Sequence, residues 1–119
     1  MSKPSYPLIG WNNTGTKSNI YKLTGLQVIG FITPATIVST SITFNIVTSE
    51  NNNPVVPILV ADSTGSAVSF TTTASKAQYY GFSQDQIAKF TGIELIQMVS
   101  GSSEAANSAF QLVLVPRQY

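Results

Sequence analysis

The sequence predicts an all-β fold: an antiparallel β-sandwich or jelly roll with one short helix and an extended N-terminal arm. Isoleucine and valine together number 21 against 7 leucines, and 13 threonines add to the β-branched total, a balance that favours strands. Several segments alternate apolar and polar residues, which is typical of half-buried strands. Turn-forming residues separate these segments at short intervals, as they do in sandwiches and jelly rolls.

Residues 1–18 are predicted to form the arm, and residues 19–119 are predicted to form the sandwich domain. The arm holds two prolines and two glycines, yet it also holds large apolar side chains and the single tryptophan, Trp11. A disordered tail would rarely be so apolar. We therefore expect protein to hold the arm in place. The body of the same chain could do so, but we favour a neighbouring chain.

The clearest strands are 41–47 and 109–115, where apolar residues occupy alternate positions. The second face of 109–115 is also apolar, which predicts a core strand covered on both sides. Further strands are expected over residues 19–23, 26–32, 55–60, 67–72, 76–80 and 92–99. The breaks carry turn-forming residues, at Thr24-Gly25, Thr33-Pro34, Asn51 to Pro54, Asp62 to Gly65 and Ser100 to Ser102.

One helix of one or two turns is predicted over residues 83–90. Ser83 can accept a hydrogen bond from a free amide at the start of this helix, and Gln86 lies three residues further on. Asp85 suits the positive end of the helix dipole.

The scarcity of charge excludes several functions. Only 9% of the residues are charged, with a net charge of +1, whereas about a quarter of an average globular chain is charged. We expect neither a nucleic-acid nor a membrane partner. Pro4 and Pro7 interrupt the region where a signal peptide would be apolar, and no run approaches the ~20 apolar residues of a membrane span. The protein is therefore expected to be made in a cytoplasm.

The residue types give little support for catalysis. Cysteine and histidine are absent, which removes thiol chemistry and the side chain most often used for proton transfer. The five acids sit beside expected turns, beside the helix or alone on a strand, where solvation and local hydrogen bonding are their usual roles; they are Glu50, Asp62, Asp85, Glu94 and Glu104. We predict no catalytic residue, no metal site and no cofactor.

Three aromatic residues, Tyr79, Tyr80 and Phe82, could form a stacking platform for a sugar or a base. Adjacent strand residues point to opposite sides of a sheet. Tyr79 and Tyr80 therefore cannot both line one site, and we expect at least one of them to pack in the core.

The second half of the chain contains short motifs in a recognisable order: Ser41 to Phe44, 56–60, Asp62 to Gly65, Ala67 to Phe70, Phe90 to Gly92, 93–99, Ser100-Gly101 and 107–115. In this order the chain resembles small virion proteins of tailed bacteriophages. The resemblance covers about residues 38 to 116, and its motifs are short and degenerate.

The resemblance implies a structural role, namely a capsid decoration or cement protein that binds at junctions between major capsid subunits and stabilises the shell. The expected partners are the major capsid protein or another virion protein, together with further copies of the chain, and the expected location is the virion after assembly in the host cytoplasm. The candidate partner-binding residues are Tyr6, Leu8, Ile9 and Trp11. A phage tail or fibre component and a carbohydrate-binding β-sandwich module remain alternatives.

Overall fold

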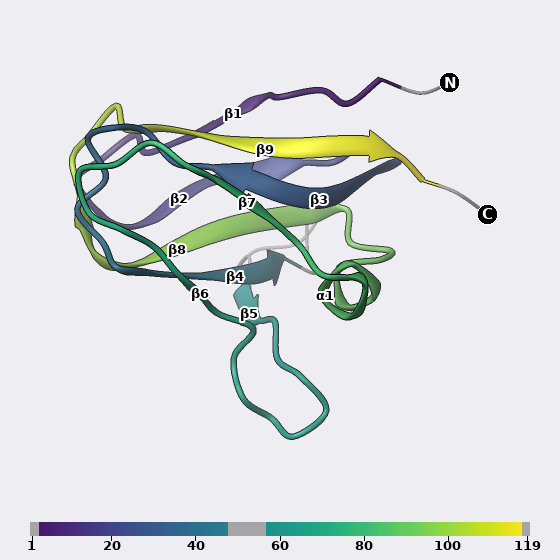
Figure 1. Cartoon of the computed structure of the whole chain (residues 1–119). Coiled ribbons are helices and arrows are strands. Elements are labelled where there is room, and N and C mark those ends of the chain that lie inside the picture. The colour runs from purple at the N-terminus through teal and green to yellow at the C-terminus, as the bar shows by residue number, and fades with distance from the viewer. Residues whose placement is uncertain (1–2, 48–56, 118–119) are drawn as a thin grey trace.

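The computed structural model describes residues 3–47 and 57–117 of the chain. Two antiparallel sheets pack against each other, with one short helix at one end (Figure 1). The predicted all-β sandwich with a single short helix is confirmed. The elements in chain order are β1 (Leu8–Gly10), β2 (Gly15–Lys22), β3 (Leu26–Ile32), β4 (Ser41–Val47), β5 (Pro57–Leu59), β6 (Phe70–Thr71), β7 (Tyr79–Gly81), α1 (Gln84–Lys89), β8 (Leu95–Glu104) and β9 (Ala109–Pro116).

The strands form two sheets, and each sheet combines strands from early and late in the sequence. The first sheet has the order β1-β9-β3-β7, and the second has the order β2-β8-β4-β5, with β6 also paired to β4. β9 lies between β1 and β3 and is therefore an internal strand of the first sheet. Phe110, Leu112 and Leu114 are fully buried against the second sheet, whereas the opposite side of β9 is only partly covered, with Val113 buried and Gln111 and Val115 half-buried.

The core between the sheets is rich in phenylalanine. Phe44 of β4 is fully buried and meets Phe31 of β3 edge to face, with ring centroids 5.7 Å apart. Phe90, which follows α1, also meets Phe44 edge to face at 5.3 Å. The alternation within 41–47 correctly placed Ile42 and Phe44 on the buried side. Aromatic pairs in this geometry add to the stability gained from apolar burial.

The expected strands 26–32 and 41–47 match β3 and β4, but β8 differs from its expected end. It continues to Glu104 through Ser100 to Ser102, which had been expected to form a turn. The Gly101 amide donates a hydrogen bond to Ser39 Oγ at 2.9 Å, and a Cβ on Gly101 would clash with Ser41 Oγ. This glycine therefore permits a close approach within a strand. The expected turn at 51–54 and residues 55 and 56 of the expected strand 55–60 lie outside the described residues.

The N-terminal segment is part of the sandwich rather than a separate arm. Ser5 pairs with Leu114, and Leu8–Gly10 pair with β9. Trp11 is 1% exposed and packs against Phe110, with ring centroids 4.7 Å apart. The predicted boundary at residue 18 falls inside β2. The apolar character that distinguished this segment from a disordered tail is therefore explained mainly by burial in the chain's own core.

The predicted helix at 83–90 is present as α1 with the predicted cap. Ser83 Oγ accepts a hydrogen bond from the Gln86 amide at 3.2 Å, and Gln86 Oε1 accepts one from the Ser83 amide at 2.8 Å. This reciprocal pair is a capping box. Asp85 in the first turn and Lys89 in the last suit the helix dipole.

Candidate functional site

The outer face of the first sheet carries exposed side chains from different strands. Leu8 on β1 is directly opposite Gln111 on β9. Gln111 is opposite Ile32 on β3, and Ile32 is opposite Tyr79 on β7. Directly opposed residues in antiparallel strands point to the same side of the sheet. This row therefore crosses the whole first sheet, a distance of about 14 Å at the usual strand spacing.

Tyr6 and Val113 lie on the same side of the sheet. The pairing of Ser5 with Leu114 and of Leu8 with Gln111 places Tyr6 opposite Val113. Gln111 Nε2 donates a hydrogen bond to the Tyr6 carbonyl at 3.0 Å, which ties this edge of the sheet together. We call the exposed and half-buried residues of this side the Tyr79 face, and its members are Tyr6, Leu8, Ile32, Tyr79 and Gln111; Val113 lies on the same side but is buried, at 3% exposed.

Tyr79 lies across two glycines and remains 58% exposed. A Cβ on Gly30 would lie 2.8 Å from Tyr79 Cε1, and one on Gly81 would lie 3.1 Å from Tyr79 Oη. The ring therefore occupies the space left by these glycines, which face each other across β3 and β7. The result is a flat aromatic surface on the sheet.

We expect Gly30→Ala to disturb this arrangement and to lower the free energy of unfolding by about 1–3 kcal/mol. Its Cβ would lie 2.7 Å from the Tyr80 carbonyl oxygen as well as against the Tyr79 ring. Urea unfolding of the purified variant measures the loss. The matched control is Gly15→Ala, because nothing lies within 4 Å of a Cβ at Gly15. An equal loss in both variants would contradict the packing described for Tyr79.

Tyr80 lies on the opposite side of β7 from Tyr79. Its ring stacks on Phe31 with centroids 5.1 Å apart and planes at 16°, and its hydroxyl donates to Gln78 Oε1 at 2.6 Å. Phe82 is buried in the core. The prediction that the two tyrosines face opposite ways, with at least one packed against the core, is confirmed.

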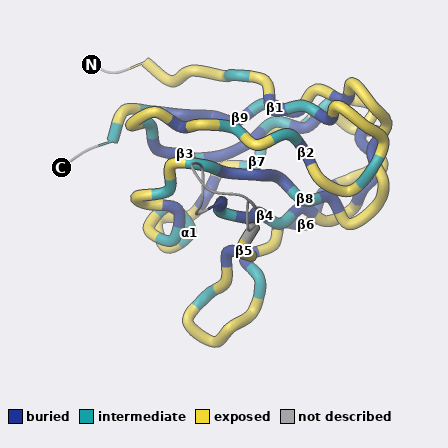
Figure 2. The backbone as a smooth tube through the Cα atoms, turned by 180° about the vertical axis from the view of Figure 1, so that it is seen from behind, coloured by how far each residue is buried: buried dark blue, intermediate teal, exposed yellow. Residues whose placement is uncertain are grey.

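The predicted partner-binding residues divide into two pairs. Tyr6 is 50% exposed and Leu8 is 63% exposed, and both lie on the Tyr79 face. Ile9 and Trp11 are buried in the chain's own core, which corrects the prediction that they contact a neighbour. The physical reason is the pleat of β1: alternate residues point to opposite sides of the sheet. Figure 2 shows the resulting mixture of buried and exposed positions around β1.

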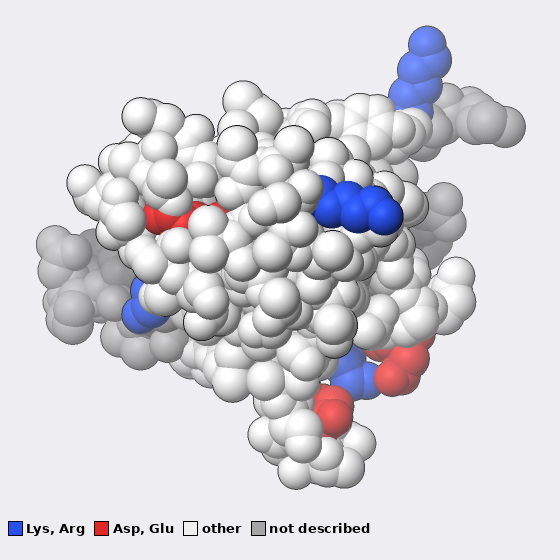
Figure 3. All heavy atoms as spheres, turned by 60° about the vertical axis from the view of Figure 1, so that its left-hand side comes forward, with Lys and Arg blue, Asp and Glu red and all other residues white. Residues whose placement is uncertain are grey.

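No outward-facing residue on the strands of the Tyr79 face is charged. Lys17 and Lys22 lie on β2 in the second sheet, and the charged residues of α1 pair with each other, Lys89 Nζ to Asp85 Oδ2, at 2.8 Å. Figure 3 shows how sparsely charge is distributed on one side of the molecule. A protein surface that covers the Tyr79 face therefore buries no ion there, and burial of unpaired ions is the most costly part of desolvation.

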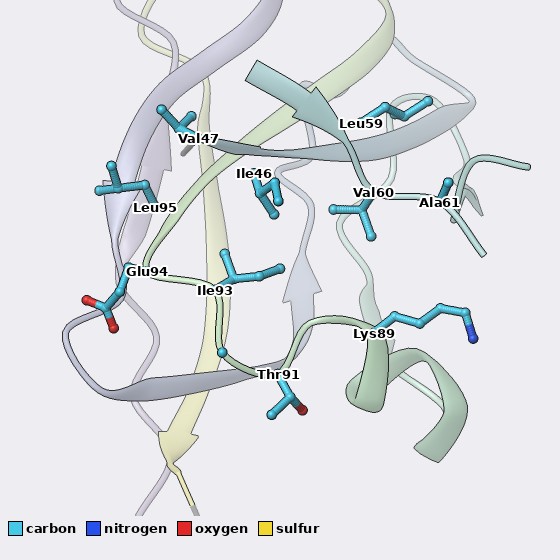
Figure 4. Close-up of a pocket in the computed structure, with 11 residues that line it drawn as sticks. Ile46, Val47, Leu59, Val60, Ala61, Lys89, Thr91, Ile93, Glu94 and Leu95 are labelled. Carbon is cyan, nitrogen blue, oxygen red and sulfur yellow. The ribbon is translucent and has the colours of Figure 1, made fainter. Parts of the chain in front are cut away.

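A hollow lies elsewhere, between the ends of β4, β5 and β8 and the helix (Figure 4). It measures about 610 Å³, and Ile46, Val60 and Ile93 contribute much of its apolar lining. Lys89 and Glu94 are the charged residues that line it. Among the described lining residues Glu94 is the one carboxylate, and its Oε1 pairs with Arg117 Nη1 at 3.2 Å, whereas acid–base work of the glycosidase kind needs two.

The other described carboxylates also form hydrogen bonds or ion pairs within the protein. Glu104 is fully buried and accepts hydrogen bonds from the Val38 amide at 3.0 Å, the Ser39 amide at 2.9 Å and Ser100 Oγ at 2.9 Å. It therefore fixes the segment before β4 to the end of β8. Glu50 lies outside the described residues.

Asp62 organises the loop between β5 and β6. Its Oδ1 accepts hydrogen bonds from Thr64 Oγ1 at 2.6 Å, the Thr64 amide at 2.8 Å and the Ser66 amide at 3.1 Å. The bonds from the Thr64 side chain and amide hold the pKa of Asp62 below its ordinary value of 3.8. The depressed pKa means that this contribution to stability is present above the unfolded-state pKa and is lost as the pH falls through the folded-state pKa.

The described residues show neither a metal-binding cluster nor a helix that could cross a membrane. No group of three or more acids, histidines or cysteines in ranges 3–47 and 57–117 could hold a metal ion. Within the same ranges, no helix has the length and apolar character needed to cross a membrane.

Ile32 and Gln111 of the Tyr79 face were not among the residues predicted to bind a partner. Alternation placed Gln111 and Val113 together on one side of their strand, and it also separated Tyr79 from Tyr80. The missing information was the strand register, which brings Leu8, Gln111, Ile32 and Tyr79 into one row. Pairing between segments this far apart in sequence cannot be derived from local patterns.

Comparison with protein-family models, curated proteins and solved structures found no match to this chain. The resemblance to phage virion proteins therefore stays a prediction.

Proposed function

We propose that the chain is a structural virion protein of a tailed bacteriophage, a capsid decoration or cement protein that binds the shell through the Tyr79 face. The observation that carries the proposal is the exposure of Tyr6, Leu8 and Tyr79 on one face whose strands present no charged side chain. The sequence resemblance supplies the virion context, and the face supplies a means of attachment.

The composition of the face suits attachment to protein. Tyrosine is enriched at the centres of protein interfaces, where its ring is buried and its hydroxyl finds a hydrogen-bond partner. Tyr79 is already held in place over Gly30 and Gly81, so binding orders it at little additional entropic cost. Gln111 can bond to partner groups at the edge of the contact. We infer that this face lies on the junction between major capsid subunits.

The test uses purified shells that lack the protein. We expect the wild-type chain to sediment with these shells. We expect Tyr79→Glu to bind them at least about tenfold more weakly, because the new carboxylate would be buried without a partner. Deletion of residues 1–18 would not be a suitable test, because it removes Ile9 and Trp11 from the core.

The matched control is Ile20→Glu. Ile20 is 43% exposed and lies on β2 in the second sheet. This control adds the same charge to an exposed apolar position away from the Tyr79 face. Equal binding by wild type and Tyr79→Glu, or equal weakening in both variants, would refute attachment through this face. Failure of the wild-type chain to bind any shell would refute the decoration role.

A carbohydrate-binding role is the second candidate, and the exposed ring of Tyr79 on a flat sheet favours it. Sugars commonly stack on such rings. Binding of the isolated protein to a glycan panel, abolished by Tyr79→Ala and retained in Ile20→Ala, would support this role in place of the shell-binding one.

A further inference from the structure

The first sheet ends at β1, and this edge has hydrogen-bonding groups that the sandwich does not use. The Ser5 amide donates to the Leu114 carbonyl at 2.8 Å, the Leu114 amide returns a bond at 3.0 Å, and the Leu112 amide donates to the Pro7 carbonyl at 3.0 Å. Residues 5 and 7 therefore bond toward β9. Because bonding alternates along an antiparallel strand, Tyr6 and Leu8 make no main-chain ladder bonds to β9, and the Leu8 amide and carbonyl point to the open side.

Tyr6 and Leu8 retain unused main-chain groups in the described structure. The Tyr6 carbonyl accepts from Gln111 Nε2. The Tyr6 amide has no partner among the hydrogen bonds of the described residues, and the alternation along the strand directs the Leu8 amide and carbonyl to the same open side. The segment lies along the outside of the first sheet in Figure 1. It presents two donors and an acceptor to any strand that approaches.

Although β1 itself is only three residues long, this edge lacks the lysines and bulges that commonly prevent strand addition. β2, the end strand of the second sheet, carries Lys17 and Lys22 and has two shifts of register against β8. Lysines and bulges both discourage pairing with another chain. By contrast, pairing along 5–10 runs without a shift of register, and none of these residues is charged. Pro7 directs its nitrogen toward β9, so it does not block the open side.

We propose that two copies of the chain pair antiparallel through β1 and join their first sheets into one continuous sheet. An antiparallel edge offers the same donors and acceptors to a second copy of itself, so a two-fold axis satisfies both copies reciprocally. The lack of charge on this edge means that the copies do not repel each other there. In the dimer, the two Tyr79 faces lie side by side on the same continuous sheet. The inference does not require the capsid to be the partner.

The experiment measures the mass of the full chain by sedimentation equilibrium over a dilution series. We expect a monomer–dimer equilibrium for wild type and a monomer for Leu8→Pro at every concentration. Proline removes the Leu8 amide hydrogen, which points away from β9, and leaves the bonds between residues 5–7 and β9 in place. Leu8→Val keeps this amide and is the matched control, expected to dimerise like wild type. Trp11 fluorescence verifies that each variant is folded.

Hydrogen exchange provides a second measurement that needs no substitution. We expect the Leu8 amide to exchange rapidly in dilute wild-type protein and to become protected as the concentration rises, while the Ile9 amide is protected throughout. A wild-type chain that remains monomeric, a Leu8→Pro variant that dimerises, or a Leu8 amide that stays unprotected in the dimer would overturn the proposal. A monomer that still sediments with shells would overturn the dimer and leave the proposed function standing.

Discussion

Trp11→Ala is expected to lower the free energy of unfolding by about 3–5 kcal/mol, the usual cost of removing a buried tryptophan. Trp11 is 1% exposed, packs on Phe110 and donates its indole N–H to the Gly15 carbonyl at 2.9 Å. The substitution therefore leaves a cavity and an unsatisfied carbonyl. This loss is a large fraction of the free energy of unfolding of a typical domain, which is about 5–15 kcal/mol. Guanidinium unfolding followed by circular dichroism measures it.

The control for this prediction is Tyr6→Ala on the same segment. Tyr6 is 50% exposed, and exposed substitutions away from special features change stability by less than about 0.5 kcal/mol. If Trp11→Ala were as stable as Tyr6→Ala, then residues 5–11 would not be part of the sandwich. The contrast thus separates a docked strand from a free arm, which binding data alone would not do.

Glu104→Ala is expected to cost about 3–5 kcal/mol, because it removes the acceptor for the Val38 and Ser39 amides and for Ser100 Oγ. Buried donors left without acceptors lose the full free energy of their hydration. The measurement is the midpoint of thermal unfolding together with urea denaturation. We expect Glu104→Gln to be intermediate, since its amide retains one acceptor oxygen and places a donor where a second acceptor is needed.

Asp85→Ala is the control for the buried carboxylate. Asp85 pairs with Lys89 on the surface of α1, and its side chain is 86% exposed. Exposed pairs of this kind contribute about 1 kcal/mol or less. Similar losses in Asp85→Ala and Glu104→Ala would show that Glu104 does not hold the segment before β4 in place.

The sequence predicted the elements whose signals are local. Alternation identified β4 and the core strand β9, and a capping serine identified α1. The predicted end of β8 was wrong because Ser100 and Gly101 are residue types that favour turns. In the structure, hydrogen bonds with Ser39 and Glu104 hold them in a strand. Tertiary contacts of this kind override local preference.

The candidate site was only partly predictable for a related reason. Apolar composition marked the N-terminal segment as packed, but it did not identify what the segment packs against. The answer depends on pairing between Leu8–Gly10 and β9, which are almost a whole chain apart. Two of the four expected contacts, Tyr6 and Leu8, lie on the exposed face, because the pleat sends Ile9 and Trp11 the other way.

The pairing of β1 with β9 also determines when the protein can finish folding. On the ribosome, Ile9 and Trp11 are synthesised about 100 residues before Phe110 and the rest of β9, with which they pack. Pairings so distant in sequence form slowly, and the apolar groups that wait for them are exposed meanwhile. The nascent chain therefore carries an unshielded tryptophan until β9 has emerged from the tunnel, and we expect chaperones that bind near the tunnel to contact this segment.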